Sequence, residues 1–127
     1  MAWKLKYHPT LSIVELIFFG DSTGKDFVEG AAARIRMGHE KQVSRFVINA
    51  RDVIAPRTQA LDVHGVLSDT YPDNHANPDS SIAVVTARDP DAAKLVEFFE
   101  SSALNRGWRV RVFDNRESAI EWLQGLD

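Results

Sequence analysis

Short apolar runs and amphipathic stretches alternate along the whole chain, and this alternation predicts its secondary structure. Trp3 to Tyr7 alternates apolar residues with lysines, which is typical of a half-exposed edge strand. A short connection leads into a second predicted strand, Leu11 to Phe19, and this favours an antiparallel hairpin. Arg45 to Asn49 and Ile82 to Val85 contain continuous apolar runs, which predict strands covered on both faces. Trp108 to Phe113 is the last predicted strand.

Apolar residues three or four positions apart predict a helix after each strand from the second onward. Phe27, Ala31 and Ile35 lie on one face of the first predicted helix. Thr23 is the expected N-cap of this helix, and Gly38 is its expected end.

The remaining helices carry similar start signals. The second is predicted from about Thr58 to Ser68, followed by a surface loop from Thr70 to Ser80 that is rich in proline, asparagine and aspartate. Asp89-Pro90 predicts the start of the third helix, because proline suits the first helical position. Asp114 is the expected N-cap of the last helix, with Glu117 completing a capping box.

These elements predict a single α/β domain that spans residues 1–127. The expected order is β-β-α-β-α-β-α-β-α, an N-terminal hairpin followed by three further strand–helix repeats. Right-handed crossovers make the later strands parallel, so we expect a mixed, mostly parallel sheet packed by four helices. The inward positions are expected to form the core: Phe46, Ile48, Val84, Val96, Phe99, Val112 and Leu123.

The composition narrows the range of partners and compartments. The chain has 15 basic and 18 acidic residues and a net charge of −3, which gives no basic surface for nucleic acid. It has no cysteine, which excludes disulfides, thiol nucleophiles and zinc–thiolate sites. Its apolar stretches are too short to span a bilayer, and its N-terminus is unlike a signal peptide. We therefore expect a cytoplasmic protein without stable membrane insertion.

Three stretches carry a family resemblance. They are F-F-G-D-S-T-G-K-D-F at 18–27, F-V-I-N-A-R-D-V at 46–53 and V-R-V-F-D-N-R-E-S-A-I-E-W-L at 110–123. Together with the element order they resemble the STAS superfamily, named for sulfate transporters and anti-sigma-factor antagonists, and especially its stand-alone SpoIIAA-like branch. The resemblance covers essentially the whole chain and implies a STAS-like fold. Members of this superfamily are mostly non-enzymatic and bind protein partners, so it also implies a regulatory or protein-interaction module.

The resemblance also concerns Thr58. In the anti-sigma antagonists, a serine or threonine in an Asp-Ser-Ser-Gly-like turn after the third strand is phosphorylated to switch binding. The corresponding turn here, Pro56-Arg57-Thr58-Gln59, keeps a hydroxyl but has no glycine and no aspartate before it. We therefore expect Thr58 to cap the second helix and not to be phosphorylated efficiently.

The sequence shows no motif that predicts catalysis, a cofactor or a metal. Gly20 to Asp26 superficially resembles a phosphate loop, but it has three residues between its glycines instead of four, and aspartate follows its lysine. None of the four histidines has a histidine at i+3 or i+4, which excludes a helical metal pair. Two aspartates and His75 could hold a metal, although a loop of turn-forming residues has the same composition. We expect no enzyme activity, no cofactor and no metal.

Polar residues gather where the parallel strands are expected to end, and sites in open α/β sheets form at such ends. We define the rim as residues 51–58 and 86–89. The candidate residues for binding an anion or an acidic partner are Arg51, Arg57, Thr58, Thr86 and Arg88. Arg116 is expected to converge on the same rim, beside helix N-termini that also favour anions. The alternative is that aspartates cap the helices here and the arginines neutralise them.

Two functions are compatible with these features. The first is a non-catalytic regulatory or protein-interaction module of STAS type that acts through the rim. The alternative is binding of a small ligand, a lipid or an anionic metabolite, at the rim or beneath it. A deep apolar cavity would favour the alternative, and an exposed apolar patch the first. Trp3, Tyr7 and Trp108 lie on or beside predicted edge strands, so we also expect a homodimer.

Overall fold

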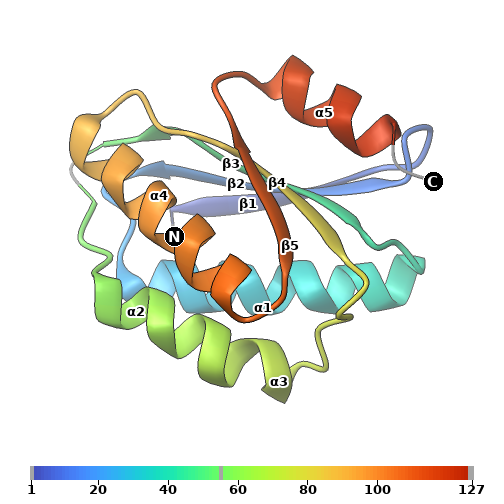
Figure 1. Ribbon diagram of the computed structural model, residues 1–127, viewed down its shortest axis with the longest axis horizontal. Helices are drawn as coiled ribbons and strands as arrows, with labels where there is room; N and C mark the ends of the chain where they lie inside the picture. Colours follow the sequence, from blue (N-terminus) through green and yellow to red (C-terminus); the bar gives the residue numbers. More distant parts are fainter. Residues whose placement is uncertain (1, 55, 126–127) are drawn as a thin grey trace.

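A five-stranded mixed sheet forms the centre of the computed structural model, which describes residues 2–54 and 56–125 (Figure 1). The strands lie in the order in which they occur along the chain: β1 (Trp3–His8), β2 (Ile13–Gly20), β3 (Arg45–Val53), β4 (Ser81–Val85) and β5 (Arg109–Phe113). Strand β1 pairs antiparallel with β2, and the other neighbours pair in parallel. The predicted α/β class and the mixed, mostly parallel sheet are therefore confirmed.

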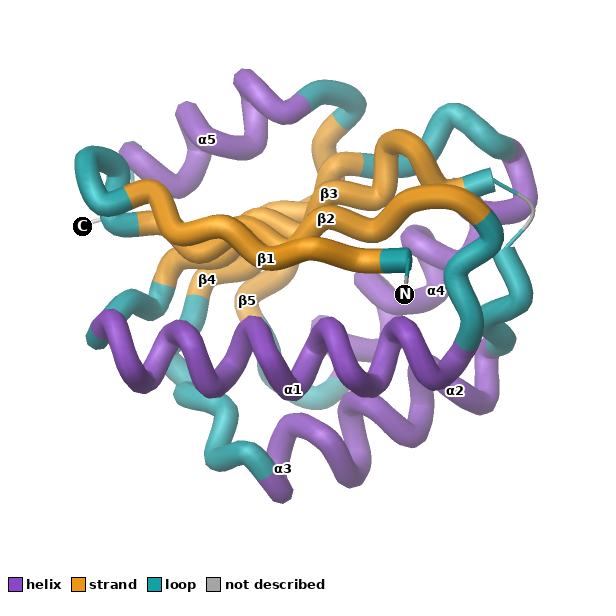
Figure 2. Tube along the Cα trace, turned by 180° about the vertical axis from the view of Figure 1, so that it is seen from behind, coloured by secondary structure: helices purple, strands orange, loops and turns teal. Residues whose placement is uncertain are grey.

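The helices cover the two faces of the sheet unequally. One face carries α1 (Gly24–Lys41), α2 (Ala60–Gly65), η1 (Val66–Thr70), α3 (Tyr71–Asp73) and α4 (Pro90–Asn105). The other face carries α5 (Arg116–Gln124). The view from behind shows α1 running the length of the sheet on one side and α5 alone on the other (Figure 2). We call these the α1 face and the α5 face.

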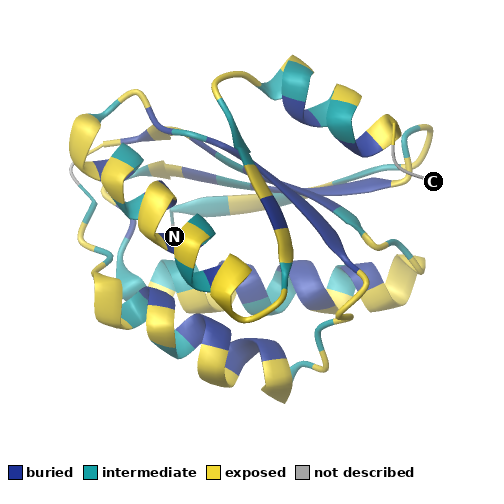
Figure 3. Cartoon of the chain, in the orientation of Figure 1, coloured by how far each residue is buried: buried dark blue, intermediate teal, exposed yellow. Residues whose placement is uncertain are grey.

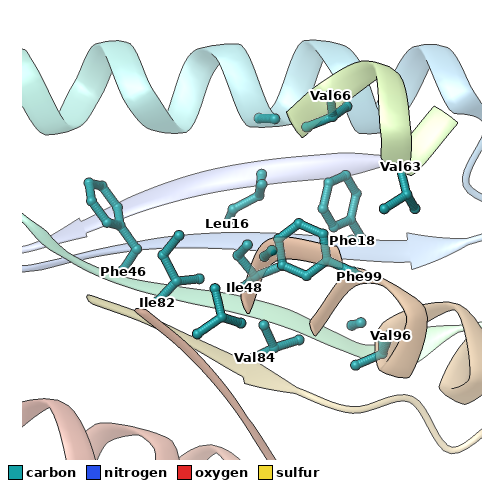
Figure 4. Packing of buried hydrophobic residues seen from close by; sticks show 14 of the residues in the cluster. Leu16, Phe18, Phe46, Ile48, Val63, Val66, Ile82, Val84, Val96 and Phe99 are labelled. Carbon is teal, nitrogen blue, oxygen red and sulfur yellow. The ribbon is translucent and has the colours of Figure 1, made fainter. Parts of the chain in front are cut away.

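The main core fills the space between the sheet and the helices of the α1 face. Figure 4 shows side chains such as Phe18, Ile48 and Phe99 gathered in this space. The middle of the sheet is buried and the outward sides of the helices are exposed (Figure 3). Six of the seven predicted core residues are buried: Phe46, Ile48, Val84, Val96, Phe99 and Leu123. Val112 is only half-buried, since β5 is an edge strand with a single neighbour.

Helix α1 begins as expected but ends later. The hydroxyl of Thr23 accepts a hydrogen bond from the backbone N–H of Asp26, so Thr23 is the N-cap. The prediction that Gly38 ends the helix is wrong, because α1 continues to Lys41 and Gln42 adopts the left-handed conformation that closes it. Gly38 serves packing instead: a Cβ atom there would lie 2.6 Å from Cζ of Phe46. The glycine thus allows α1 and β3 to approach closely.

The second helical segment is longer than its sequence indicated. It begins at Ala60 rather than Thr58 and continues through a π-helical turn to Asp73. The prediction of a surface loop beginning at Thr70 is therefore wrong for its first residues, since Thr70 and Tyr71 are buried. The apolar contacts that Tyr71 makes in the core outweigh the turn preference of the following proline and aspartate.

The last helix also starts one residue later than predicted. Asn115, not Asp114, is its N-cap, and the Asn115 side chain accepts a 2.8 Å hydrogen bond from the backbone N–H of Ser118. Both residue types suit an N-cap, so the position of the strand end decides between them. Among the described residues, no helix has the length and apolar character needed to cross a membrane.

Candidate functional site

The first rim segment, residues 51–58, is tied to residues 20–22 at the carboxyl ends of β2 and β3. The backbone N–H of Ile54 donates to the carbonyl of Gly20, and that of Arg57 donates to the carbonyl of Ser22, both at 2.9 Å. The hydroxyl of Thr58 donates to the same Ser22 carbonyl at 3.0 Å. Ala55, which falls within the predicted rim, lies outside the described residues. These bonds fix the rim loop against the sheet.

The predicted arginines do not all meet at the rim. Arg51 and Arg88 are exposed neighbours, because the backbone N–H of Arg88 donates to the carbonyl of Arg51 at 3.4 Å. Within residues 2–54 and 56–125, neither forms an ion pair. Arg57 lies 3.2 Å from Asp21 in an exposed pair, which contributes little to stability. Arg116 binds a carboxylate on the α5 face, so its expected convergence on the rim is wrong.

The two candidate threonines have mainly structural contacts. Thr58 is half-buried and bridges two loops, so the prediction that it caps the second helix is wrong. Gln59 is the N-cap, and its backbone N–H donates to Asp62 at 2.7 Å. Thr86 is also half-buried, and its backbone N–H donates to the carbonyl of Phe113 at 2.9 Å.

A small apolar cavity lies beneath the rim on the α1 face. Its volume is about 70 Å³, and its walls include Phe18, Val96, Phe99 and the loop residue Pro56. Ligand pockets usually have volumes of about 300–1,000 Å³, and this cavity lies well below that range.

Apolar side chains are exposed in several segments next to the rim cavity, and the most exposed are those of Ile54 and Leu61. Ile54 is 60% exposed and Leu61 is 77% exposed. Exposed apolar side chains are typical of surfaces that bind other proteins.

A buried carboxylate on the α5 face organises a second polar cluster. Glu15 on β2 is 2% exposed, and its oxygens accept hydrogen bonds from Nε and Nη2 of Arg116 at 2.8–3.2 Å. Nε2 of His8 lies 2.8 Å from the same carboxylate, and the amide of Asn49 donates to it at 3.4 Å. Burial alone would raise the pKa of Glu15, but the hydrogen bonds from Arg116 and His8 outweigh it and lower the pKa. This closed network holds α5 against the sheet.

A larger pocket lies on the α1 face at the opposite, amino end of the parallel strands. Its volume is about 340 Å³, within the range of ligand pockets. Arg34 of α1 is buried in its wall and donates from Nη2 to the hydroxyl of Tyr71 at 2.6 Å. Burial raises the pKa of Tyr71, so the phenol stays neutral and does not compensate the arginine charge. We call this cavity the Arg34 pocket.

The sequence pattern places both buried charged residues, Arg34 and Glu15, at inward-facing positions. Arg34 follows Ala31 by three positions and Phe27 by seven, which places it within the apolar stripe of the first helix. Glu15 interrupts an otherwise apolar strand between Val14 and Leu16. A charged residue at an inward position must find a partner, a ligand or water, and that rule could have identified both residues.

The histidine-containing loop shows no metal site. His75 is exposed with a φ angle of 54°, and His39 contacts the backbone carbonyl of Asn74 at 3.1 Å. In the part of the chain that the structure describes, no cluster of three potential ligands could hold a metal ion.

A scan against protein-family models found no match, and searches of curated proteins and of solved structures found no significant similarity.

Proposed function

We propose that this protein is a non-catalytic interaction module of the STAS type, SpoIIAA-like in its element order, and that its rim binds a protein partner. The observation that carries the proposal is that Arg51 and Arg88 are adjacent, exposed and without ion pairs among the described residues. Ile54 and Leu61 are exposed apolar residues in the segments next to the rim cavity. Arginine forks bind carboxylates in two-point contacts. The partner therefore presents an acidic segment with at least one apolar side chain.

The size of the rim cavity favours a protein partner over a small molecule. At about 70 Å³ it admits an apolar side chain but not a lipid chain. Ile54 and Leu61 extend the apolar contact outside the cavity, where the anchor residue of a partner would lie. Lipid binding at the rim is correspondingly disfavoured.

We further propose that binding is not switched by phosphorylation of Thr58. Its hydroxyl already donates to the carbonyl of Ser22 and is half-buried, so a kinase would first have to open the loop. High phosphate occupancy at Thr58 in protein isolated from its own cells, measured by phosphopeptide mapping, would contradict this.

A triple substitution tests the rim. Arg51→Ala, Arg57→Ala and Arg88→Ala together should abolish capture of the partner from a lysate of the source cells. The unfolding free energy should change by less than about 0.5 kcal/mol, since the substituted side chains are exposed. The matched control removes three exposed cations elsewhere, through Arg36→Ala, Lys94→Ala and Arg111→Ala. Equal capture by the rim variant and the wild type would show that the rim arginines only neutralise nearby acids.

A homodimer is a separate part of this proposal. Trp3 and Tyr7 lie on edge strand β1, Trp108 precedes edge strand β5, and all three are half-buried against the core. Edge strands need cover, and a second copy would supply it. Light scattering at high protein concentration should give the mass of a dimer, and a strictly monomeric mass would refute this part alone.

A further inference from the structure

The guanidinium of Arg34 is a buried charge without a counter-ion. Arg34 is 2% exposed, and no carboxylate of the described chain lies within 4.0 Å of its nitrogens. Its Nε atom is buried and has no hydrogen-bond partner, while Nη2 donates to Tyr71. Burying a charge without a partner opposes folding, so native proteins rarely retain one without a compensating ligand or function.

Aromatic rings hold the guanidinium in place. Its carbon lies 4.8 Å from the ring centre of Phe46 and 5.2 Å from that of Tyr71. Trp108 packs edge-on against Tyr71, with ring centres 5.1 Å apart. Aromatic contacts stabilise the cation without using its in-plane N–H groups, of which Nη2 donates to Tyr71 and Nε has no partner in the described chain. The arginine is thus oriented before any ligand arrives.

The pocket beside Arg34 has room for the missing counter-ion. Its volume of about 340 Å³ suits a small molecule. Its lining is mixed: Phe46, Ile82 and Trp108 are apolar, whereas Arg34, Gln42, Ser44 and Ser80 are polar. His39 and Asn77, both exposed, mark its open side. A ligand that enters there would meet an apolar side formed by Phe46, Ile82 and Trp108, a polar side, and the buried positive charge of Arg34.

We propose that the Arg34 pocket binds a small organic carboxylate with an apolar body. The single charge of Arg34 matches a monoanion, whereas a phosphate dianion would leave uncompensated negative charge in the pocket. A planar carboxylate fits the in-plane N–H groups of a guanidinium, and the hydroxyl of Tyr71 can donate to one of its oxygens. Phe46, Ile82 and Trp108 provide the apolar contact for the rest of the ligand. This site is distinct from the rim, which lies at the other end of the sheet.

Benzoate and hexanoate are suitable probes, since each is a monocarboxylate with an apolar body. Titrated at millimolar concentration into the wild-type protein, at least one should shift the NMR signals of Arg34, Phe46, Tyr71 and Trp108. Nuclear Overhauser contacts between probe and Phe46 ring protons should place it in the pocket. Benzyl alcohol, which has the same ring without charge, and inorganic phosphate should bind at least tenfold more weakly.

Substitutions test whether carboxylate binding depends on the charge of Arg34 itself. Arg34→Met removes the charge with similar volume and should weaken carboxylate binding more than tenfold. Arg36→Met, an exposed arginine on the same helix, should leave affinity unchanged. If Arg34→Met does not fold, the proposal is tested by two other results. The wild type should show Overhauser contacts between the probe and Phe46, and Tyr71→Phe should bind the carboxylate more weakly. Absence of binding by both carboxylates, phosphate binding of equal strength, or unchanged affinity in folded Arg34→Met would overturn the proposal.

Discussion

Glu15 and Arg34 are the two buried charged side chains of the described chain, one on each face of the sheet, and each is 2% exposed. Glu15 is bound by Arg116, His8 and Asn49. Arg34 has one neutral hydrogen-bond partner and an adjoining pocket of about 340 Å³. The two side chains are equally buried, but Glu15 has charged and polar partners whereas Arg34 has no counter-ion among the described residues. The network around Glu15 is complete and fastens α5, whereas the site of Arg34 lacks an anion and has space for one.

The difference in packing space follows from how the helices cover the two faces. The α5 face has a single helix over a small cluster that includes Ile13, Val47 and Leu123. The α1 face carries α1, α2, η1, α3 and α4. Their packing leaves the rim cavity at the carboxyl end of the parallel strands and the Arg34 pocket at the amino end. Binding sites are expected where the packing leaves such space and where a polar group faces into it.

The largest expected effect comes from breaking the complete network. Glu15→Ala should lower the unfolding free energy by about 3 kcal/mol, because Arg116, His8 and Asn49 lose their shared acceptor. Urea denaturation measures the change. Glu97→Ala, at an exposed position of α4, should cost less than about 0.5 kcal/mol. Equal effects of the two substitutions would mean that the Glu15 network does not fasten α5.

The same network predicts a pH dependence. The pKa of Glu15 is lower in the folded protein than its ordinary value of 4.5, so its ionised form stabilises the fold above that value. This stabilisation is lost as the pH falls through the folded pKa. The difference in unfolding free energy between wild type and Glu15→Gln should therefore be large at pH 7 and shrink as the pH falls below 4.5. A difference that stays constant with pH would contradict the assignment.

Enlarging the rim cavity should have a moderate effect. Val96 is buried and lines this cavity, so Val96→Ala should lower the unfolding free energy by about 1–3 kcal/mol through lost contacts. Chemical denaturation measures the loss. A change of only a few tenths would show that α4 does not pack against the sheet here.

A smaller effect is expected at Thr58. Thr58→Ala removes the hydrogen bond to the Ser22 carbonyl and should cost about 1 kcal/mol. Because Gln59 is the N-cap of α2, amide exchange in Ala60–Gly65 should stay as slow as in the wild type. Thr10→Ala, in an exposed turn, is the matched control. Faster exchange confined to α2 would instead support a capping role.

The sequence was sufficient for the α/β class and the mixed, mostly parallel sheet, because periodic apolar positions repeat in every element. The strand that begins at Arg45 and the cap at Thr23 are found where the pattern places them. The strand order also explains why Arg51 and Arg88 could be assigned to one rim. These features depend on local spacing and on the geometry of parallel strands, both of which a single sequence displays.

The Arg34 pocket could not be predicted in the same way. It depends on contact between α1 and Tyr71, which follows a π-helical turn that the sequence did not reveal. The proline after Tyr71 favoured a loop, and the buried ring was missed with it. Thr58 was misassigned because its hydroxyl contacts a carbonyl 36 residues away in the chain. Long-range polar contacts of this kind leave no periodic pattern.

Thermal unfolding of Arg34→Met beside the wild type, each with and without benzoate, tests the contrast between the two buried charges most directly. Without benzoate, the variant should be within about 1 kcal/mol of the wild type or more stable, because an unpaired buried charge is replaced by an apolar side chain. Benzoate should raise the melting temperature of the wild type alone. A clearly less stable variant together with no benzoate shift in the wild type would show that Arg34, like Glu15, is only structural.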